Sequence, residues 1–248
     1  MKKNLFTIFF SMLLLLSTSA FGQGVNIYKS NGTIITVPCE ELDSIVAYYD
    51  ADPYNGHEYV DLGLSVKWAT CNIGAKKPEA YGERYSWGEI QSKESYYWGT
   101  YTLCVPNGKY AYSSILKYNN TDKIVELESS DDVANIKWGG KWRMPTQKEI
   151  KELLNKCKWS HQTKNGVKGV LVTGPNGNSI FLPATGHKVD FSKNDEEGIT
   201  GFYWTKTLES RILERYAIGL VFNETTQGES SSAWSERCNG FSVRAVIE

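Results

Sequence analysis

Helical periodicity is rare in this chain, although aromatic residues and glycine are abundant. The 248 residues include 8 Trp, 15 Tyr, 9 Phe and 22 Gly. Aromatic side chains favour strands, and frequent glycines indicate many tight turns. We therefore expect an α+β fold that is rich in strands and long loops and contains one or two helices.

The clearest helix is predicted over residues 146–157. Thr146 and Glu149 match a T-x-x-E capping box, which marks the start of a helix. A second, shorter helix is predicted over 131–137, with Ser130 as its cap. The apolar residues of the first helix recur on one face, which we expect to be buried: Ile150, Leu153, Leu154 and Cys157.

Strands are predicted where β-branched and aromatic residues gather between turn formers. Residues 169–173 and 179–182 form a predicted hairpin that is closed by the turn at 175–178. The last predicted strand, 241–247, alternates strictly between two faces. One of these faces carries Phe241, Val243, Ala245 and Ile247. The other predicted strands are 59–62, 66–70, 202–205 and 216–222.

The first residues have the three-part pattern of a secretory signal. Lys2 and Lys3 precede an apolar run over 5–16, and small residues follow it. Because this run is too short to span a bilayer, we predict a signal peptide over residues 1–22 and no membrane insertion after its cleavage. An uncleaved anchor helix is the alternative. The mature protein is expected to be secreted or periplasmic, and association with the cell surface is compatible with either location.

Residues 23–56 are predicted to form a small β unit and a linker. Two strands, 25–28 and 33–37, flank an Asn-Gly turn signal, and a third strand is predicted over 44–49. Turn formers over 50–56 indicate the linker. The main domain is then predicted over 57–248.

Charge and cysteine content exclude several classes of function. The formal net charge of −1 gives no electrostatic reason to expect binding to nucleic acid or to an anionic membrane surface. The five cysteines have no metal-binding spacing, so a zinc site is not expected. One or two disulfides fit this number, but spacing does not give their pairing, and at least one thiol stays free or pairs between chains. The cysteines are Cys39, Cys71, Cys104, Cys157 and Cys238.

Six short motifs follow one another along the predicted main domain. They are Tyr59-Val60-Asp61-Leu62-Gly63-Leu64, Lys67-Trp68-Ala69-Thr70-Cys71-Asn72-Ile73-Gly74, Tyr85-Ser86-Trp87-Gly88-Glu89, Trp138-Gly139-Gly140-Lys141-Trp142-Arg143-Met144-Pro145-Thr146, Phe202-Tyr203-Trp204-Thr205 and Gly240-Phe241-Ser242-Val243-Arg244. In this order they resemble the Fibrobacter succinogenes major paralogous domain family, which is similar to the C-type lectin-like fold of formylglycine-generating enzymes and of retroelement variable proteins. The resemblance covers about 190 residues of the chain. It implies a C-type lectin-like domain whose last strand, 241–247, lies beside 59–62 or 66–70.

The same resemblance raises the question of enzyme activity. Trp142-Arg143-Met144-Pro145-Thr146 is similar to a motif of formylglycine-generating enzymes, which need two reactive cysteines near the C-terminal end of the domain. The corresponding stretch here, 211–246, contains only Cys238. We therefore expect a structural role for the motif, in which Arg143 bonds carbonyl groups or a carboxylate and Pro145-Thr146 begins the helix.

Other catalytic and metal-binding patterns are not found in the sequence. The three histidines lie in no known catalytic motif, and a carboxylate pair such as Glu209 and Glu214 is expected by chance in a domain of this size. The acidic stretch 190–197 fits a solvated loop better than a calcium site. No catalytic residue, metal or cofactor is predicted. The histidines are His57, His161 and His187.

Binding is the remaining class of function, and its predicted location is the irregular segment before the last strand, 204–240. In C-type lectin-like domains this region usually meets the ligand, and here it mixes aromatic and polar groups that suit a glycan or a protein. The alternative for Trp204 and Trp234 is that their side chains lie in the core. Tyr96-Tyr97-Trp98 is a second candidate platform for ligand binding. The alternative is that these residues form a loop that packs over the core. The predicted ligand-binding residues are Trp204, Arg211, Arg215, Asn223 and Trp234.

The sequence thus predicts a secreted, non-catalytic recognition module that binds a glycan or a protein at the cell surface. A structural or adhesive component of a surface assembly is the alternative, and an enzyme of unknown type is the third hypothesis.

Overall fold

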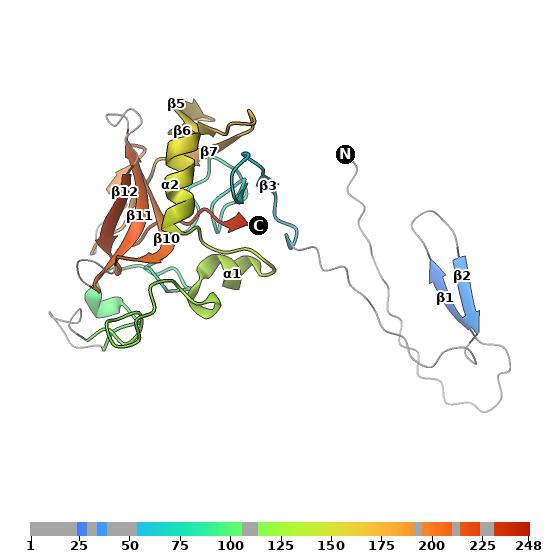
Figure 1. Cartoon of the computed structure of the whole chain (residues 1–248), viewed down its shortest axis with the longest axis horizontal. Coiled ribbons are helices and arrows are strands. Elements are labelled where there is room, and N and C mark those ends of the chain that lie inside the picture. Colours follow the sequence, from blue (N-terminus) through green and yellow to red (C-terminus); the bar gives the residue numbers. More distant parts are fainter. Residues whose placement is uncertain are drawn as a thin grey trace. The chain divides into compact units, whose positions relative to one another are not determined.

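The computed structural model describes residues 24–28, 34–38, 54–105, 114–190, 195–209, 214–223 and 231–248. The chain divides into two compact units, Met1–Asp50 and Ala51–Glu248 (Figure 1). In the first unit, β1 (Gly24–Tyr28) and β2 (Ile34–Pro38) pair antiparallel, which confirms the two strands predicted there. The predicted signal peptide and the predicted strand over 44–49 lie outside the described residues.

The described residues of the second unit are rich in strands and contain two short α-helices, which confirms the α+β class. Its five-stranded sheet has the order β12-β11-β10-β8-β9, and two three-stranded sheets have the orders β13-β4-β3 and β5-β6-β7. The strands are β3 (Tyr59–Val60), β4 (Lys67–Ala69), β5 (Lys158–Lys164), β6 (Val167–Thr173), β7 (Ser179–Pro183), β8 (Thr185–His187), β9 (Asp195–Glu197), β10 (Thr200–Leu208), β11 (Tyr216–Asn223), β12 (Ser231–Glu236) and β13 (Val246–Ile247). The helices are α1 (Val133–Trp138) and α2 (Gln147–Lys156), with 3-10 turns at Trp98–Thr100 and Ser129–Asp131.

The five-stranded sheet separates two hydrophobic clusters. On β10, the adjacent residues Tyr203 and Trp204 point to opposite faces because side chains alternate along a strand. Tyr203 belongs to the cluster that also contains Ile150 and Leu153 of α2 and Val170 and Val172 of β6. Figure 1 shows α2 lying across this sheet. Trp204 belongs to the cluster on the other face, together with Trp87, Trp142 and Phe241.

The C-terminal segment closes the second unit. Val246 of β13 pairs with Trp68 of β4, which confirms the predicted contact between the last strand and 66–70. The alternation is also confirmed: the four residues predicted on one side lie in the cluster of Trp204, whereas Val246 lies in the cluster of Tyr203. The regular strand is shorter than predicted, because within 241–245 only Phe241 and Ser242 make bridges, each an isolated one, to Tyr85 and Tyr203.

The predicted start of α2 is confirmed in detail. The Thr146 side chain accepts a hydrogen bond from the Glu149 amide, and the Glu149 carboxylate accepts one from the Thr146 amide. Arg143 donates two hydrogen bonds to the same carboxylate, at 2.9 and 2.7 Å, as expected for a structural arginine. Cys157 at the end of α2 is only half-buried and packs at the margin of the core.

The predicted cap of α1 is wrong. The helix begins after Asp132, whose carboxylate accepts hydrogen bonds from the amides of Ala134, Asn135 and Met144. Ser130 lies instead in the preceding 3-10 turn. Asp132 replaces it because an ionised carboxylate can accept several amide hydrogen bonds at once, whereas a hydroxyl accepts fewer.

The Thr146→Ala variant tests the capping box. We expect it to lower the free energy of unfolding by about 1 kcal/mol, since the Glu149 amide loses its acceptor. Urea unfolding measures this loss, and Thr121→Ala at an exposed loop position is the control. Equal stability of the two variants would contradict the proposed cap.

Three buried arginines hold the long loops together. Arg237 donates hydrogen bonds to the Tyr101 hydroxyl at 2.9 Å and to the carbonyl groups of Lys117, Tyr118 and Glu214. Arg244 donates to the carbonyl groups of Ala69, Thr70 and Phe181, and Arg84 donates to those of Tyr81 and Gly82. None of the three forms an ion pair within the described ranges. Their guanidinium groups supply the hydrogen bonds that regular secondary structure would otherwise supply.

Candidate functional site

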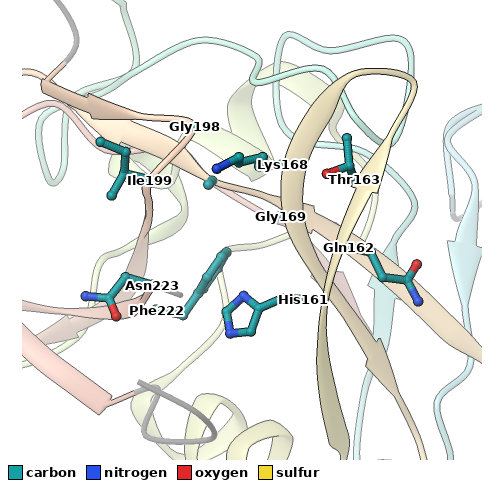
Figure 2. Close-up of a pocket in the computed structure, with 10 residues that line it drawn as sticks. His161, Gln162, Thr163, Lys168, Gly169, Gly198, Ile199, Phe222 and Asn223 are labelled. Atoms are coloured by element: carbon teal, nitrogen blue, oxygen red, sulfur yellow. The ribbon is translucent and has the colours of Figure 1, made fainter. Parts of the chain in front are cut away.

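A polar cavity opens where the β5-β6-β7 sheet meets the end of β11. Its volume is about 230 Å³. Figure 2 shows His161, Lys168, Ile199, Phe222 and Asn223 around the open space. We call this space the junction cavity.

The register of the β5–β6 hairpin explains why the junction cavity is polar. Trp159 pairs with Val172, and His161 pairs with Val170, so these side chains share the inner face of the hairpin. Near α2 this face is apolar and packs on the core. Further along, the same face carries Thr163 and its pair Lys168, beyond the ring of Phe222. His161, Thr163 and Lys168 are exposed on this face beside the cavity, where they are suited to contact a ligand.

A second cavity, of about 300 Å³, is lined by side chains of both charges. Glu83 and Glu94 lie at its wall with Lys93 and Lys188. Lys93 forms an ion pair with the buried Glu89, and Lys188 lies over the Tyr96 ring. Lys93, Lys188 and Glu83 thus already have partners inside the protein, Glu83 by accepting a hydrogen bond from the Tyr85 hydroxyl.

A partly exposed aromatic strip lies at the other end of β11, along the edge of the five-stranded sheet. The rings of Tyr216 and Trp234 meet edge to face, with centroids 4.7 Å apart. The Arg215 guanidinium lies 4.9 Å from the centre of the Tyr216 ring and forms an ion pair with Glu236. Glu236 also accepts a hydrogen bond from the indole of Trp98 at 3.1 Å. The aromatic strip therefore consists of Trp98, Arg215, Tyr216, Trp234 and Glu236.

The predicted binding residues are distributed over three places. Arg215 and Trp234 lie in the aromatic strip, where Trp234 is 50 % exposed, and Asn223 lies in the junction cavity. Trp204 is 0 % exposed and donates its indole hydrogen to the Tyr85 carbonyl oxygen, so it is a core residue, as the alternative for it stated. Arg211 lies outside the described residues.

The second predicted platform divides in the same way. Tyr96 is buried and donates a hydrogen bond from its hydroxyl to the Arg84 carbonyl oxygen. Trp98 is half-buried and joins the aromatic strip. The sequence reasoning treated Trp98 and Trp234 as separate features, although the fold places them together.

Outside the strands predicted at 202–205 and 216–222, the segment 204–240 is predicted to be irregular, and this prediction is wrong for 231–236. These residues form β12, which pairs antiparallel with β11 from Ser231–Val221 to Glu236–Tyr216. The sequence Ser-Ser-Ala-Trp-Ser-Glu has no β-branched residue, so it carries little strand propensity of its own. Pairing with the apolar strand β11 determines its conformation.

Acidic groups and thiols were also considered as functional sites. No cluster of three or more potential metal ligands occurs in the described part of the chain, and residues 191–194 of the acidic stretch fall outside it. Glu209 is buried, and Glu214 accepts a hydrogen bond from the Asn120 amide.

The described cysteines, all except Cys39, are free. Cys104 and Cys238 lie in one small buried cluster with Tyr101, a proximity that their sequence spacing did not indicate. Burial raises the pKa of both thiols, which disfavours reactive thiolates.

Comparison with known proteins gives no match: no family model, curated protein or solved structure is significantly similar to this chain. Among the described residues, no helix has the length and apolar character needed to cross a membrane.

Proposed function

We propose that this chain is an exported, non-catalytic recognition module of C-type lectin-like fold, and that the junction cavity holds a sugar ring of a glycan at the cell surface. The observation that carries the proposal is the change from apolar to polar side chains along the inner face of β5–β6, beside Phe222 and Asn223. Export is proposed from the predicted signal peptide. The pairing of β13 with β4 supports the lectin-like fold, because that fold brings its chain ends together.

The size and chemistry of the junction cavity favour a single sugar ring. Its volume of about 230 Å³ lies below the range of roughly 300–1,000 Å³ that is typical for drug-sized ligands. Asn223, Thr163 and His161 can each donate and accept hydrogen bonds, which matches the hydroxyl groups of a sugar. Phe222 and Ile199 supply apolar surface for the C–H groups of the ring.

The alternative is a structural or adhesive component of a surface assembly. One observation favours it: β12 lies at an edge of the five-stranded sheet and carries the half-exposed Trp234. Such an edge can join another polypeptide, whereas the junction cavity admits only a small group.

A glycan array with the mature chain, beginning near Gln23, tests the proposal. We expect binding to a defined subset of glycans. The double variant His161→Ala, Asn223→Ala should weaken that binding about tenfold or more, since it removes two hydrogen-bonding groups from the cavity wall, and about 1.4 kcal/mol corresponds to a factor of ten. Thermal unfolding should change little, because His161 is exposed and Asn223 ends its strand.

Lys158→Ala is the matched control. Lys158 is exposed at the start of β5 and does not line the junction cavity, so its replacement should leave glycan binding unchanged. The proposal is overturned if no glycan binds, or if the double variant binds as tightly as the control.

A further inference from the structure

The peptide group of Trp234 faces away from the sheet. Arg237 directly follows β12, and its amide donates a hydrogen bond to the carbonyl oxygen of Arg215, which directly precedes β11. The peptide group of Arg237 therefore faces β11. Along an antiparallel strand, residues direct their peptide groups alternately to the two sides. Ser235 and Ala233 therefore bond β11, while Trp234 directs its N–H and C=O outward. In the described part of the chain, no residue bonds the outward N–H or C=O of Trp234.

The β11 register supports the same assignment. The Tyr216 carbonyl oxygen accepts a hydrogen bond from the Glu209 amide, and the Ile218 carbonyl oxygen accepts one from the Thr205 hydroxyl. Both groups thus face β10. Ala217 and Gly219, which alternate with them, face β12 and pair with Ser235 and Ala233. The outward direction of Trp234 follows independently from each side of the ladder.

Within the described residues, the edge formed by β12 carries little of the usual protection against strand pairing. Exposed edge strands are commonly blocked by lysine, by proline or by a bulge. β12 contains neither lysine nor proline, and its pairing with β11 is continuous over six residues. Near the centre of β12, the half-exposed Trp234 ring lies beside Tyr216, so apolar surface and outward-facing peptide groups occur together.

We propose that β12 binds an extended segment of a partner polypeptide as an additional strand, with an apolar side chain of that segment packing on Trp234 and Tyr216. The outward N–H and C=O of one residue match the alternating groups of a strand, which a folded helix cannot offer. The aromatic pair then selects for an apolar residue near the centre of the bound segment.

A second copy of this chain is a weaker match for the same edge. Toward its end, the Glu236 carbonyl oxygen already accepts the Asn239 amide, which shortens the free edge. Pairing two such short edges buries far less than the roughly 1,200–2,000 Å² of a stable protein interface. A flexible peptide needs only a few backbone hydrogen bonds and one anchored side chain.

This docking surface is separate from the proposed glycan site. Tyr216 is the first residue of β11 and Asn223, in the junction cavity, is the last. Loss of glycan binding in the cavity variants would therefore leave the β12 proposal standing, and the reverse also holds.

Amide hydrogen exchange of the mature protein provides the first test. In the free protein, the Trp234 amide should exchange quickly, whereas the Ala233 and Ser235 amides are protected by the ladder. Random linear peptides displayed on phage are selected on the protein, and the tightest binder is synthesised. Adding this peptide should protect the Trp234 amide, and a version N-methylated at alternate residues should fail to bind.

Three variants then separate the contribution of the β12 backbone to peptide binding from that of the Trp234 side chain. Trp234→Ala removes the anchor, and Ser232→Pro removes an outward N–H without removing a ladder bond, because Ser232 and Trp234 share one direction. Each should weaken peptide binding about tenfold or more. Ser235→Ala, which faces the other side of the sheet, is the control and should bind as the unaltered protein does.

Several results would overturn the proposal. One is a Trp234 amide that is already protected in the free protein or stays unprotected when the peptide binds. Others are equal binding of the N-methylated peptide, or a selection that yields no binder. A concentration-dependent dimer that protects the Trp234 amide would assign the edge to a second copy. If Ser232→Pro fails to fold, exchange in the unaltered protein still decides the question.

Discussion

Removal of residues 241–248 is expected to leave the second unit unfolded. All seven residues from Phe241 to Ile247 are buried, and they contribute to both hydrophobic clusters. Burial of each large apolar side chain contributes roughly 1.5–3 kcal/mol. The four large ones, Phe241, Val243, Val246 and Ile247, together approach the roughly 5–15 kcal/mol of net stability that is typical of a whole domain.

Hydrogen bonding adds to this effect. The last residues exchange backbone hydrogen bonds with Arg143 and with Tyr85, and the buried Arg244 would be lost with them. Circular dichroism and thermal unfolding of a chain ending at Gly240 would show the loss of cooperative structure. Removal of Glu248 alone is the control, because its side chain is 79 % exposed and its 3.6 Å contact with Arg143 is a surface ion pair. A chain ending at Gly240 that unfolds cooperatively would contradict this account of the fold.

The elements predicted correctly are those whose signals are local. The capping box at Thr146 and Glu149 has three-residue spacing, and the alternation over 241–247 needs no information from the rest of the chain. The β6–β7 hairpin is likewise indicated by its own turn residues. In each case the residues that make the structure are neighbours in the sequence.

Elements that depend on distant partners were missed. β12 has weak strand propensity, and its conformation comes from β11. The hydrogen bonds of Arg237 reach Tyr101, more than a hundred residues earlier in the chain. An arginine in a polar stretch gives no indication that it will be buried, since arginine is usually exposed.

The same limit applies to the candidate sites. The sequence indicated that 204–240 is rich in polar and aromatic residues, and Arg215, Asn223 and Trp234 do lie in the two surfaces described above. It could not indicate that Asn223 would line one cavity with His161 of β5, or that Trp98 would donate a hydrogen bond to Glu236 of β12. These meetings follow from sheet order and strand register, which are tertiary properties.

Replacement of Arg237 by methionine is expected to destabilise the second unit by about 3 kcal/mol or more. Its guanidinium is 0 % exposed and lies 4.7 Å from the centre of the Trp87 ring. Methionine fills similar space but donates no hydrogen bonds. The carbonyl groups of Lys117, Tyr118 and Glu214 would then be left without this donor, and a buried acceptor left unsatisfied costs about 1–3 kcal/mol.

Thermal unfolding measures the effect as a fall in the melting temperature of about 10 °C, given roughly 2–4 °C per kcal/mol for a domain of this size. Arg237→Lys should recover only part of the loss, because an ammonium group cannot reproduce the planar fork that reaches four acceptors. Arg215→Met is the matched control: its ion pair with Glu236 is partly exposed and contributes at most about 1 kcal/mol. If Arg237→Met and Arg215→Met melt at the same temperature, the buried guanidinium does not hold the loops together, and apolar packing alone must do so.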